Sequence, residues 1–261
     1  MPLFFILTFV VAVLCVLIPA LALRILGARW KLEKKIFWRA GIAGIFCTML
    51  ILGVVLNIDS SFAGFTKLPD FVQALILGLV TGLFAELGKF LVLDRMLPQV
   101  RDRRSAIFFG IGWSGVALLF SGFLIAVGVF GMQNLLNTQD LTAAFPNIDA
   151  DQLKFFNESK TAVQALVNGP AIKAFTPLLE NLMLLVTDVA MTLLIVAGLK
   201  KKRTSNVWLA VGLRTVLATS VFFVIAGNGV PNWLPVEAVF AVWIAVMGAL
   251  ALKLQAAFAA S

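Results

Sequence analysis

The chain has 261 residues, of which 61% are hydrophobic and 13% charged, and its mean hydropathy is +1.01. A soluble domain carries about 25% charged residues, so this composition excludes an ordinary soluble protein and indicates an integral membrane protein. The net charge of +8 does not indicate a nucleic-acid partner, because the basic residues lie in short clusters between apolar segments, as the positive-inside rule predicts.

Seven apolar segments are near or above the ~20 residues that a helix needs to cross the hydrocarbon core. Such segments must satisfy their own backbone hydrogen bonds, so each is predicted to be a helix. The predicted fold is an all-α, polytopic membrane helix bundle of about seven transmembrane helices in a single transmembrane domain, residues 1–261. The predicted spans are residues 3–25, 37–57, 71–94, 105–131, 172–199, 206–226 and 234–252.

The distribution of lysine and arginine predicts the orientation of these spans. Basic residues concentrate in the links after the first, third and fifth spans, and Lys253 follows the seventh. The opposite links and their margins hold only Lys67, Lys154, Lys160 and Lys173. Because basic links stay in the cytoplasm, we expect the N-terminus outside and the C-terminus cytoplasmic.

A cleaved signal peptide is the alternative interpretation of the first span. The segment Ala20-Leu21-Ala22 resembles a cleavage site, but the start Met1-Pro2-Leu3 has no positive charge. Cleavage would also leave the most basic link of the chain without a preceding span.

One long link, residues 132–171, is predicted on the outer side. It contains the stretch LKFFNESKTAVQALV, whose mixture of apolar and polar residues is typical of an amphipathic interfacial helix. One interpretation is a solvated loop with one or two short helices. The other is an element that binds a partner or covers a substrate.

Ionisable side chains inside the spans are candidates for a functional site, because a charge at mid-bilayer costs at least ~2.5–3.5 kcal/mol. At a helical rise of 1.5 Å per residue, four unusual side chains on four spans lie ~14–18 Å above the cytoplasmic boundary. These four are Glu86, Trp113, Asp188 and Arg214; Lys89 lies about a turn lower, and Glu180 lies nearer the outer face.

The intramembrane charges suggest two ion pairs. Glu86 and Lys89 are spaced i,i+3 on one helix, and Asp188 and Arg214 lie at matching depth on consecutive antiparallel helices. Thr192 follows Asp188 by one turn and adds a hydroxyl to this predicted polar layer. Two interpretations stay open: ion pairs that fix helix packing, or a site that recognises a polar group in the bilayer.

Small residues flank the predicted polar layer on two spans. Gly78, Gly82 and Ala85 form a stripe that leads to Lys89, and Gly110 and Ser114 have the i,i+4 spacing. Small residues at this spacing let membrane helices approach closely, so we expect tight helix packing around the charges.

The chain has no histidine, and its only cysteines are Cys15 and Cys47, both in apolar spans. The most common metal ligand and general base is therefore absent. The sequence predicts no metal, no cofactor and no disulfide framework.

Four stretches of the chain resemble a known family: GLVTGLFAELGKFLVLDRML, AIFFGIGWSGVALLFSG, LLENLMLLVTDVAMTLLIVAGLKKKR and NVWLAVGLRTVLATSVFF. In order and spacing they are similar to the YhfC-type intramembrane proteases, within the wider PrsW and CAAX-protease-like membrane group. The resemblance covers about residues 70–260. It implies a Glu-Glu pair followed by a basic residue, and three helices that each bring a histidine.

The positions that match this pattern carry other side chains. Ala85 stands at the first glutamate, whereas Glu86 and Lys89 match the second glutamate and the basic residue. Trp113, Asp188 and Arg214 stand at the three histidine positions. In the family, the glutamate and histidines activate a water for peptide hydrolysis, directly or around a metal. Arginine stays protonated and tryptophan is only a donor, so neither replaces a histidine.

The resemblance therefore suggests a catalytically inactive relative of these proteases, a membrane-embedded binding or accessory protein in the plasma (inner) membrane of a bacterium. Its expected partner is another membrane protein or a lipid. The alternatives are a structural subunit of a membrane complex, a small transporter with the charges along its path, and an active protease. Activity would require Glu86 and Asp188 to work as a carboxylate pair.

Overall fold

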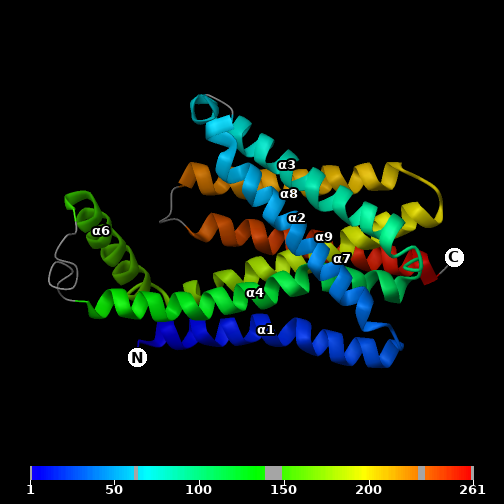
Figure 1. Ribbon diagram of the computed structural model, residues 1–261, viewed down its shortest axis with the longest axis horizontal. Helices are drawn as coiled ribbons and strands as arrows, with labels where there is room; N and C mark the ends of the chain where they lie inside the picture. Colours follow the sequence, from blue (N-terminus) through cyan, green and yellow to red (C-terminus); the bar gives the residue numbers. More distant parts are fainter. Residues whose placement is uncertain (1, 62–63, 139–148, 229–232, 260–261) are drawn as a thin grey trace. The chain divides into compact units, whose positions relative to one another are not determined.

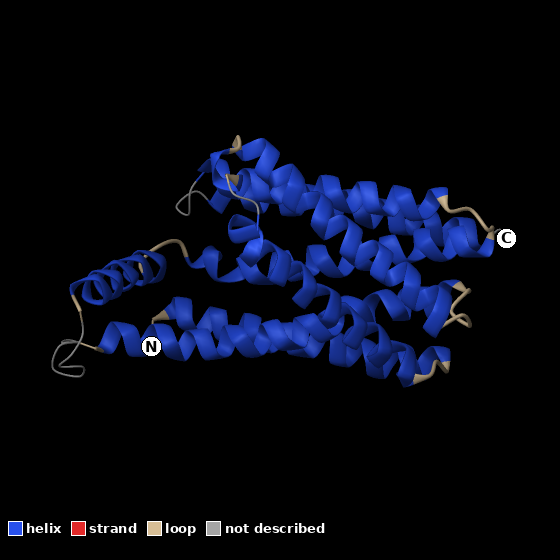
Figure 2. Cartoon of the chain, turned by 45° about the horizontal axis from the view of Figure 1, so that its top comes forward, coloured by secondary structure: helices blue, strands red, loops and turns tan. Residues whose placement is uncertain are grey.

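The computed structural model describes residues 2–61, 64–138, 149–228 and 233–259, and these residues form helices and turns without a strand among them (Figure 2). Within the described residues, six helical segments are long and apolar enough to cross a membrane: Leu3–Trp30, Lys34–Ile58, Asp70–Met96, Arg103–Asn137, Ala171–Lys200 and Ser205–Val224. The predicted seventh span falls on a further helix, whose stretch Ala238–Leu254 is also apolar. The predicted polytopic helical fold is confirmed.

The helices follow one another in chain order with short connections, and their labels are those of Figure 1. They are α1 (Leu3–Trp30), α2 (Lys34–Ser61), α3 (Asp70–Leu91), α4 (Arg103–Asn137), α6 (Ala150–Val167), α7 (Thr176–Lys200), α8 (Ser205–Asn228) and α9 (Trp233–Ala259). A π-helical turn, Val92–Met96, continues α3, and short 3-10 turns occupy Phe65–Lys67 and Ala171–Phe175. The predicted span 105–131 is shorter than α4, because the helix continues to Asn137 through polar residues.

The chain divides into two compact units. The first unit consists of residues 1–17 and 119–178, and the second of residues 18–118 and 179–261. Each unit is built from separate stretches of sequence, because α1 and α4 each contribute one part to either unit.

The first unit has a small apolar core in which Phe4 and Phe5 of α1 pack with Val129 of α4 and Ala174. The helix predicted inside the link 132–171 is present as α6. It begins with a capping box, in which the Asp149 carboxylate accepts from the Gln152 backbone N–H at 2.7 Å. The rest of that link, residues 139–148, lies outside the described residues.

The second unit holds the larger core, where α2, α4 and α7 meet. The rings of Phe37 on α2 and Phe108 on α4 lie 5.8 Å apart, and both side chains are fully buried. Glycine makes the contact between α4 and α7 possible: a Cβ on Gly110 would lie 2.7 Å from the Cα of Val189. The small residues predicted around the polar layer thus let α4 approach α7 closely.

Two helices of the second unit end in the same capping motif. Lys31 after α1 and Lys202 after α7 both have φ of 53°, in the left-handed region. The backbone N–H of the next residue donates to a carbonyl five residues earlier: Leu32 to Gly27 after α1, and Arg203 to Gly198 after α7. This is the Schellman pattern, which satisfies carbonyl groups that the helix leaves free.

Helices α3 and α8 pack along each other through the predicted small-residue stripe. A Cβ on Gly78 would lie 2.1 Å from Thr219 Oγ1, and one on Gly82 would lie 2.3 Å from Thr215 Oγ1. These distances leave no room for a side chain, so the two glycines set the separation of the helices that carry Lys89 and Arg214.

We expect Gly82→Ala to destabilise the protein by about 1–3 kcal/mol, the usual cost of overpacking. The added methyl would meet the Val211 carbonyl oxygen at 2.9 Å as well as the Thr215 hydroxyl, and a backbone atom cannot turn away. The change in the free energy of unfolding is measured in mixed micelles, by circular dichroism at increasing concentrations of a denaturing detergent. Gly212→Ala is the matched control, because a Cβ there meets nothing within 4 Å.

Asp102 caps the N-terminus of α4. Its carboxylate accepts from the backbone N–H of Arg104 at 2.8 Å, from that of Ser105 at 3.1 Å, and from the Ser105 hydroxyl. Desolvation by burial would raise the pKa of Asp102, but these hydrogen bonds from Ser105 and Arg104 outweigh it and hold the pKa below its ordinary value.

We expect Asp102→Ala to lower the free energy of unfolding by about 1 kcal/mol at neutral pH, as for other helix caps. Because the folded-state pKa of Asp102 is depressed, the stabilisation that depends on ionisation of its carboxyl group is present at neutral pH. It is lost as pH falls below about 4, through the folded-state pKa. Unfolding curves of wild type and Asp102→Asn across this pH range measure that part, since asparagine caps a helix without titrating. Parallel curves for the two proteins would contradict the prediction.

Candidate functional site

Three helices of the second unit bring the intramembrane charges together. Glu86 and Lys89 lie one turn apart on α3, Asp188 lies in the middle of α7, and Arg214 lies in the first half of α8. The packing of α3 on α8 through Gly82 and Gly78 brings the charged stretches of these two helices side by side.

These four side chains form one connected polar network. Lys89 Nζ lies 2.8 Å from Glu86 Oε1 and 2.7 Å from Asp188 Oδ1, and Arg214 Nη1 lies 3.4 Å from Asp188 Oδ1. Both predicted ion pairs are therefore present, and the Lys89–Asp188 contact that joins them was not predicted. The long Lys89 side chain reaches from α3 to α7, which sequence spacing alone does not indicate.

The polar network is buried and electrically neutral. Glu86 and Lys89 are both 0% exposed, and two carboxylates balance two cations. A buried ion pair of good geometry offsets much of its desolvation cost, whereas a single buried charge does not. Each of these charged side chains can therefore lie inside the membrane only because the others are present.

Some polar atoms of this region lack a hydrogen-bond partner. They are Glu86 Oε2, Arg214 Nε and the hydroxyls of Thr187, Thr215 and Thr219. Since nearly all buried polar groups in folded proteins are paired, these atoms mark the region as incompletely satisfied by the chain itself. Thr187, fully buried beside Asp188 on α7, is a member of this region that the sequence analysis missed.

Trp113 lies against the network from α4. Lys89 Nζ is 5.6 Å from the centroid of the indole, a cation–π distance, and the indole also stacks on Phe109. Ala85 is buried on α3 beside Glu86. The structure thus places Trp113 at the network, whereas Ala85 brings only a methyl group to α3 beside Glu86.

Two other residues named from the sequence lie on α7 with Asp188. Thr192 is fully buried one turn after Asp188, and its hydroxyl donates to the backbone carbonyl of Asp188 at 2.7 Å. A threonine inside a helix commonly bonds the carbonyl four residues earlier, and this local bond is the one formed here. Glu180 lies eight residues before Asp188 on α7, roughly 12 Å along the helix axis.

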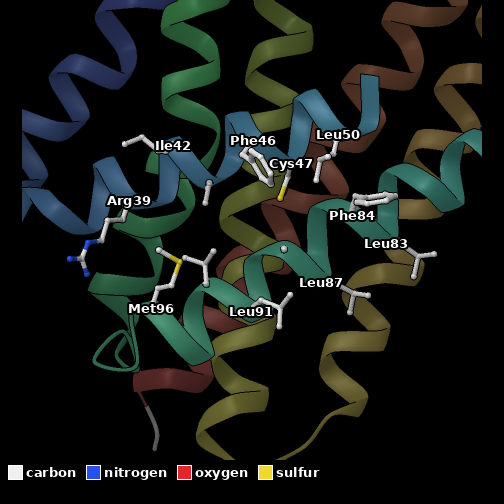
Figure 3. A pocket seen from close by; sticks show the side chains of 13 residues that line it. Arg39, Ile42, Phe46, Cys47, Leu50, Leu83, Phe84, Leu87, Leu91 and Met96 are labelled. Carbon is white, nitrogen blue, oxygen red and sulfur yellow. The ribbon is translucent and has the colours of Figure 1, made fainter. Parts of the chain in front are cut away.

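An apolar groove of about 920 Å³ runs between α2 and α3, on the second unit (Figure 3). Its lining comprises Arg39, Ile42, Ala43, Phe46, Cys47, Leu50, Leu83, Phe84, Leu87, Gly88, Leu91, Val92 and Met96. A Cβ on Gly88 would lie 2.5 Å from Cys47 Sγ and 3.4 Å from Trp113 Cη2. The indole of Trp113 therefore separates the floor of the groove from Lys89. The sequence analysis missed this groove, because its apolar residues look like any lipid-facing helix surface.

We expect Asp188→Ala to be strongly destabilising, by about 3–5 kcal/mol, because it leaves Arg214 without a carboxylate and gives the network a net charge. The double variant Asp188→Leu/Arg214→Leu should be milder, since it removes one charge of each sign and keeps the Glu86–Lys89 pair. Folded yield after detergent extraction, together with unfolding in mixed micelles, measures both variants. An Asp188→Ala protein with the folded yield and stability of wild type would contradict the polar network.

Comparison with protein families gives one match, to the model described as YhfC intramembrane metalloprotease, over residues 14–241. Comparisons with curated proteins and with solved structures found no match. The matched region includes every member of the polar network and the whole α2–α3 groove, and it covers most of the 261 residues. The chain is therefore a membrane protein that belongs to the YhfC intramembrane metalloprotease family.

Proposed function

We propose that this chain is a catalytically inactive member of its family and acts as a membrane-embedded binding or accessory protein. The observation that carries the proposal is the position of Lys89 Nζ, within 2.8 Å of Glu86 and 2.7 Å of Asp188. An ammonium group lies between the two carboxylates that a hydrolytic site would need.

The side chains of this region do not fit the metal that the family description implies. A catalytic zinc needs about three protein ligands of nitrogen, sulfur or oxygen type. The chain contains no histidine, and no group of three or more Cys, Asp or Glu side chains within its described part is arranged to hold a metal ion. Glu86 and Asp188 already contact Lys89, so a metal ion would have to compete with the Lys89 ammonium group for these two carboxylates.

Activation of a water without a metal is also poorly supported. A general base needs a free acceptor and a route for the proton it takes. Glu86 is fully buried and its Oε1 accepts from Lys89. Its Oε2 has no hydrogen-bond partner that could carry a proton away, and Arg214, also buried, stays protonated. Glu86 and Asp188 therefore do not form a carboxylate pair available for hydrolysis.

A binding role fits the parts that remain. The polar network ties α3, α7 and α8 together through contacts within the chain. The groove between α2 and α3 offers a surface for another membrane component, either a membrane protein or a lipid. We place the protein in the plasma membrane of a bacterium with its N-terminus outside and its C-terminus cytoplasmic, as the basic links favour.

Zinc content tests the proposal directly. We expect the purified full-length chain to retain less than stoichiometric zinc after incubation with the metal and desalting, measured by mass spectrometry of the metal. The matched control is Ala85→Glu/Trp113→His/Asp188→His/Arg214→His, which restores the side chains of the family pattern and should retain more zinc. One zinc per wild-type chain would overturn the proposal, as would peptide hydrolysis that Glu86→Gln abolishes.

A gentle-detergent purification with mass spectrometry of the bound molecules then identifies the partner class. A stoichiometric membrane protein or a retained lipid would support a binding role. A chain that hydrolyses a co-purified peptide would instead support an active enzyme.

A further inference from the structure

We infer that the α2–α3 groove binds one acyl chain of an anionic phospholipid, with the lipid phosphate held by Arg39. The inference rests on the proposed binding function and names the class of ligand for it. Figure 3 shows Arg39 at one end of the groove, with Ile42, Phe46 and Leu50 following it along α2.

The length of the groove matches one leaflet of the bilayer. Its α2 side runs from Arg39 to Leu50, which is about 16 Å along a helix axis at 1.5 Å per residue. The hydrocarbon core of a bilayer is about 30 Å thick, so an acyl chain from one headgroup to the midplane needs about half of it.

The shape of the groove comes from small residues between larger ones. The small residues Ala43 and Gly88 are half-buried in its lining, while the larger Phe46 and Phe84 are exposed. The volume of about 920 Å³ lies within the roughly 300–1,000 Å³ of typical ligand sites. Apart from Arg39 at the end, every lining side chain is apolar or, for Cys47, only weakly polar, which suits a hydrocarbon chain.

The charge at the end of the groove selects the headgroup. Arg39 is exposed and makes no ion pair or side-chain hydrogen bond with the described residues. Lys35, one turn earlier on α2, contacts Glu33, and Arg95, next to the lining residue Met96, lies 3.4 Å from Asp94. A free guanidinium binds phosphate through charge-assisted hydrogen bonds. In the predicted orientation it also lies at the cytoplasmic surface, where membranes carry anionic lipids.

Native mass spectrometry of the full-length chain in detergent tests the inference, with palmitoyl-oleoyl phosphatidylglycerol and phosphatidylcholine as probes. The two lipids share acyl chains and differ in headgroup charge. We expect wild type to retain phosphatidylglycerol preferentially, and Arg39→Gln to reduce that preference about fivefold, the contribution of one arginine near an anionic headgroup. Arg39→Lys should keep part of the preference. Arg104→Gln is the matched control, because Arg104 is an exposed boundary arginine away from the groove.

Blocking the groove provides the second arm. Ala43→Phe should reduce retention of both lipids, because the ring fills the floor of the groove. If this variant fails to fold, Ile42→Trp makes the same test at a side chain that is 65% exposed.

Four results would overturn the inference. Equal retention of the two lipids by wild type, or an unchanged preference in Arg39→Gln, would reject Arg39 as the phosphate site. Undiminished retention when the groove is blocked would place the lipid elsewhere. A dimer that Ala43→Phe dissociates would show that a second copy of the chain occupies the groove. None of these results changes the zinc content of the wild-type protein, so the proposed loss of activity is judged separately.

Discussion

The arrangement of this protein inside the membrane depends on one ammonium group, that of Lys89, which contacts the carboxylates of Glu86 and Asp188. In a medium that cannot solvate ions, each of these charges is acceptable only because the others are present. The contact joins α3 to α7, and Asp188 extends it to Arg214 on α8. Close packing at Gly78, Gly82 and Gly110 is the geometric counterpart, because without it the side chains would not reach one another.

Under the proposed function, the network also explains how a member of a metalloprotease family keeps its fold without a metal. A metal ion at a site of several helices supplies positive charge that holds negative or polar ligands from each of them. Here a lysine and an arginine supply that charge from within the chain, and they are attached to helices that must pack anyway. The stabilising role of a central cation is retained, while the open coordination position that hydrolysis requires is not.

Much of this site was predictable from the sequence, and what was not has physical reasons. Helical rise places Glu86, Asp188 and Arg214 in one layer, and the i,i+3 and antiparallel relations give both ion pairs. The bridge from Lys89 to Asp188 was missed, because sequence spacing gives depth in the membrane but not which helix faces which. The acceptor of the Thr192 hydroxyl was also left open by the sequence, and the local backbone carbonyl of Asp188 takes it. The α2–α3 groove could not be predicted from the sequence, since a lipid-facing helix surface and a groove wall have the same composition.

The order of charges along the chain also bears on how the protein enters the membrane during synthesis. Helix α3 carries Glu86 and Lys89 together, so these two buried charges are balanced within one helix when it leaves the ribosome. Asp188 and Arg214 lie on the consecutive helices α7 and α8, so their charges are balanced within one hairpin. Each of these charges thus enters the bilayer together with its counter-ion. The Lys89–Asp188 contact between α3 and the α7–α8 hairpin can form only after both have entered the bilayer, which makes it a late step of assembly.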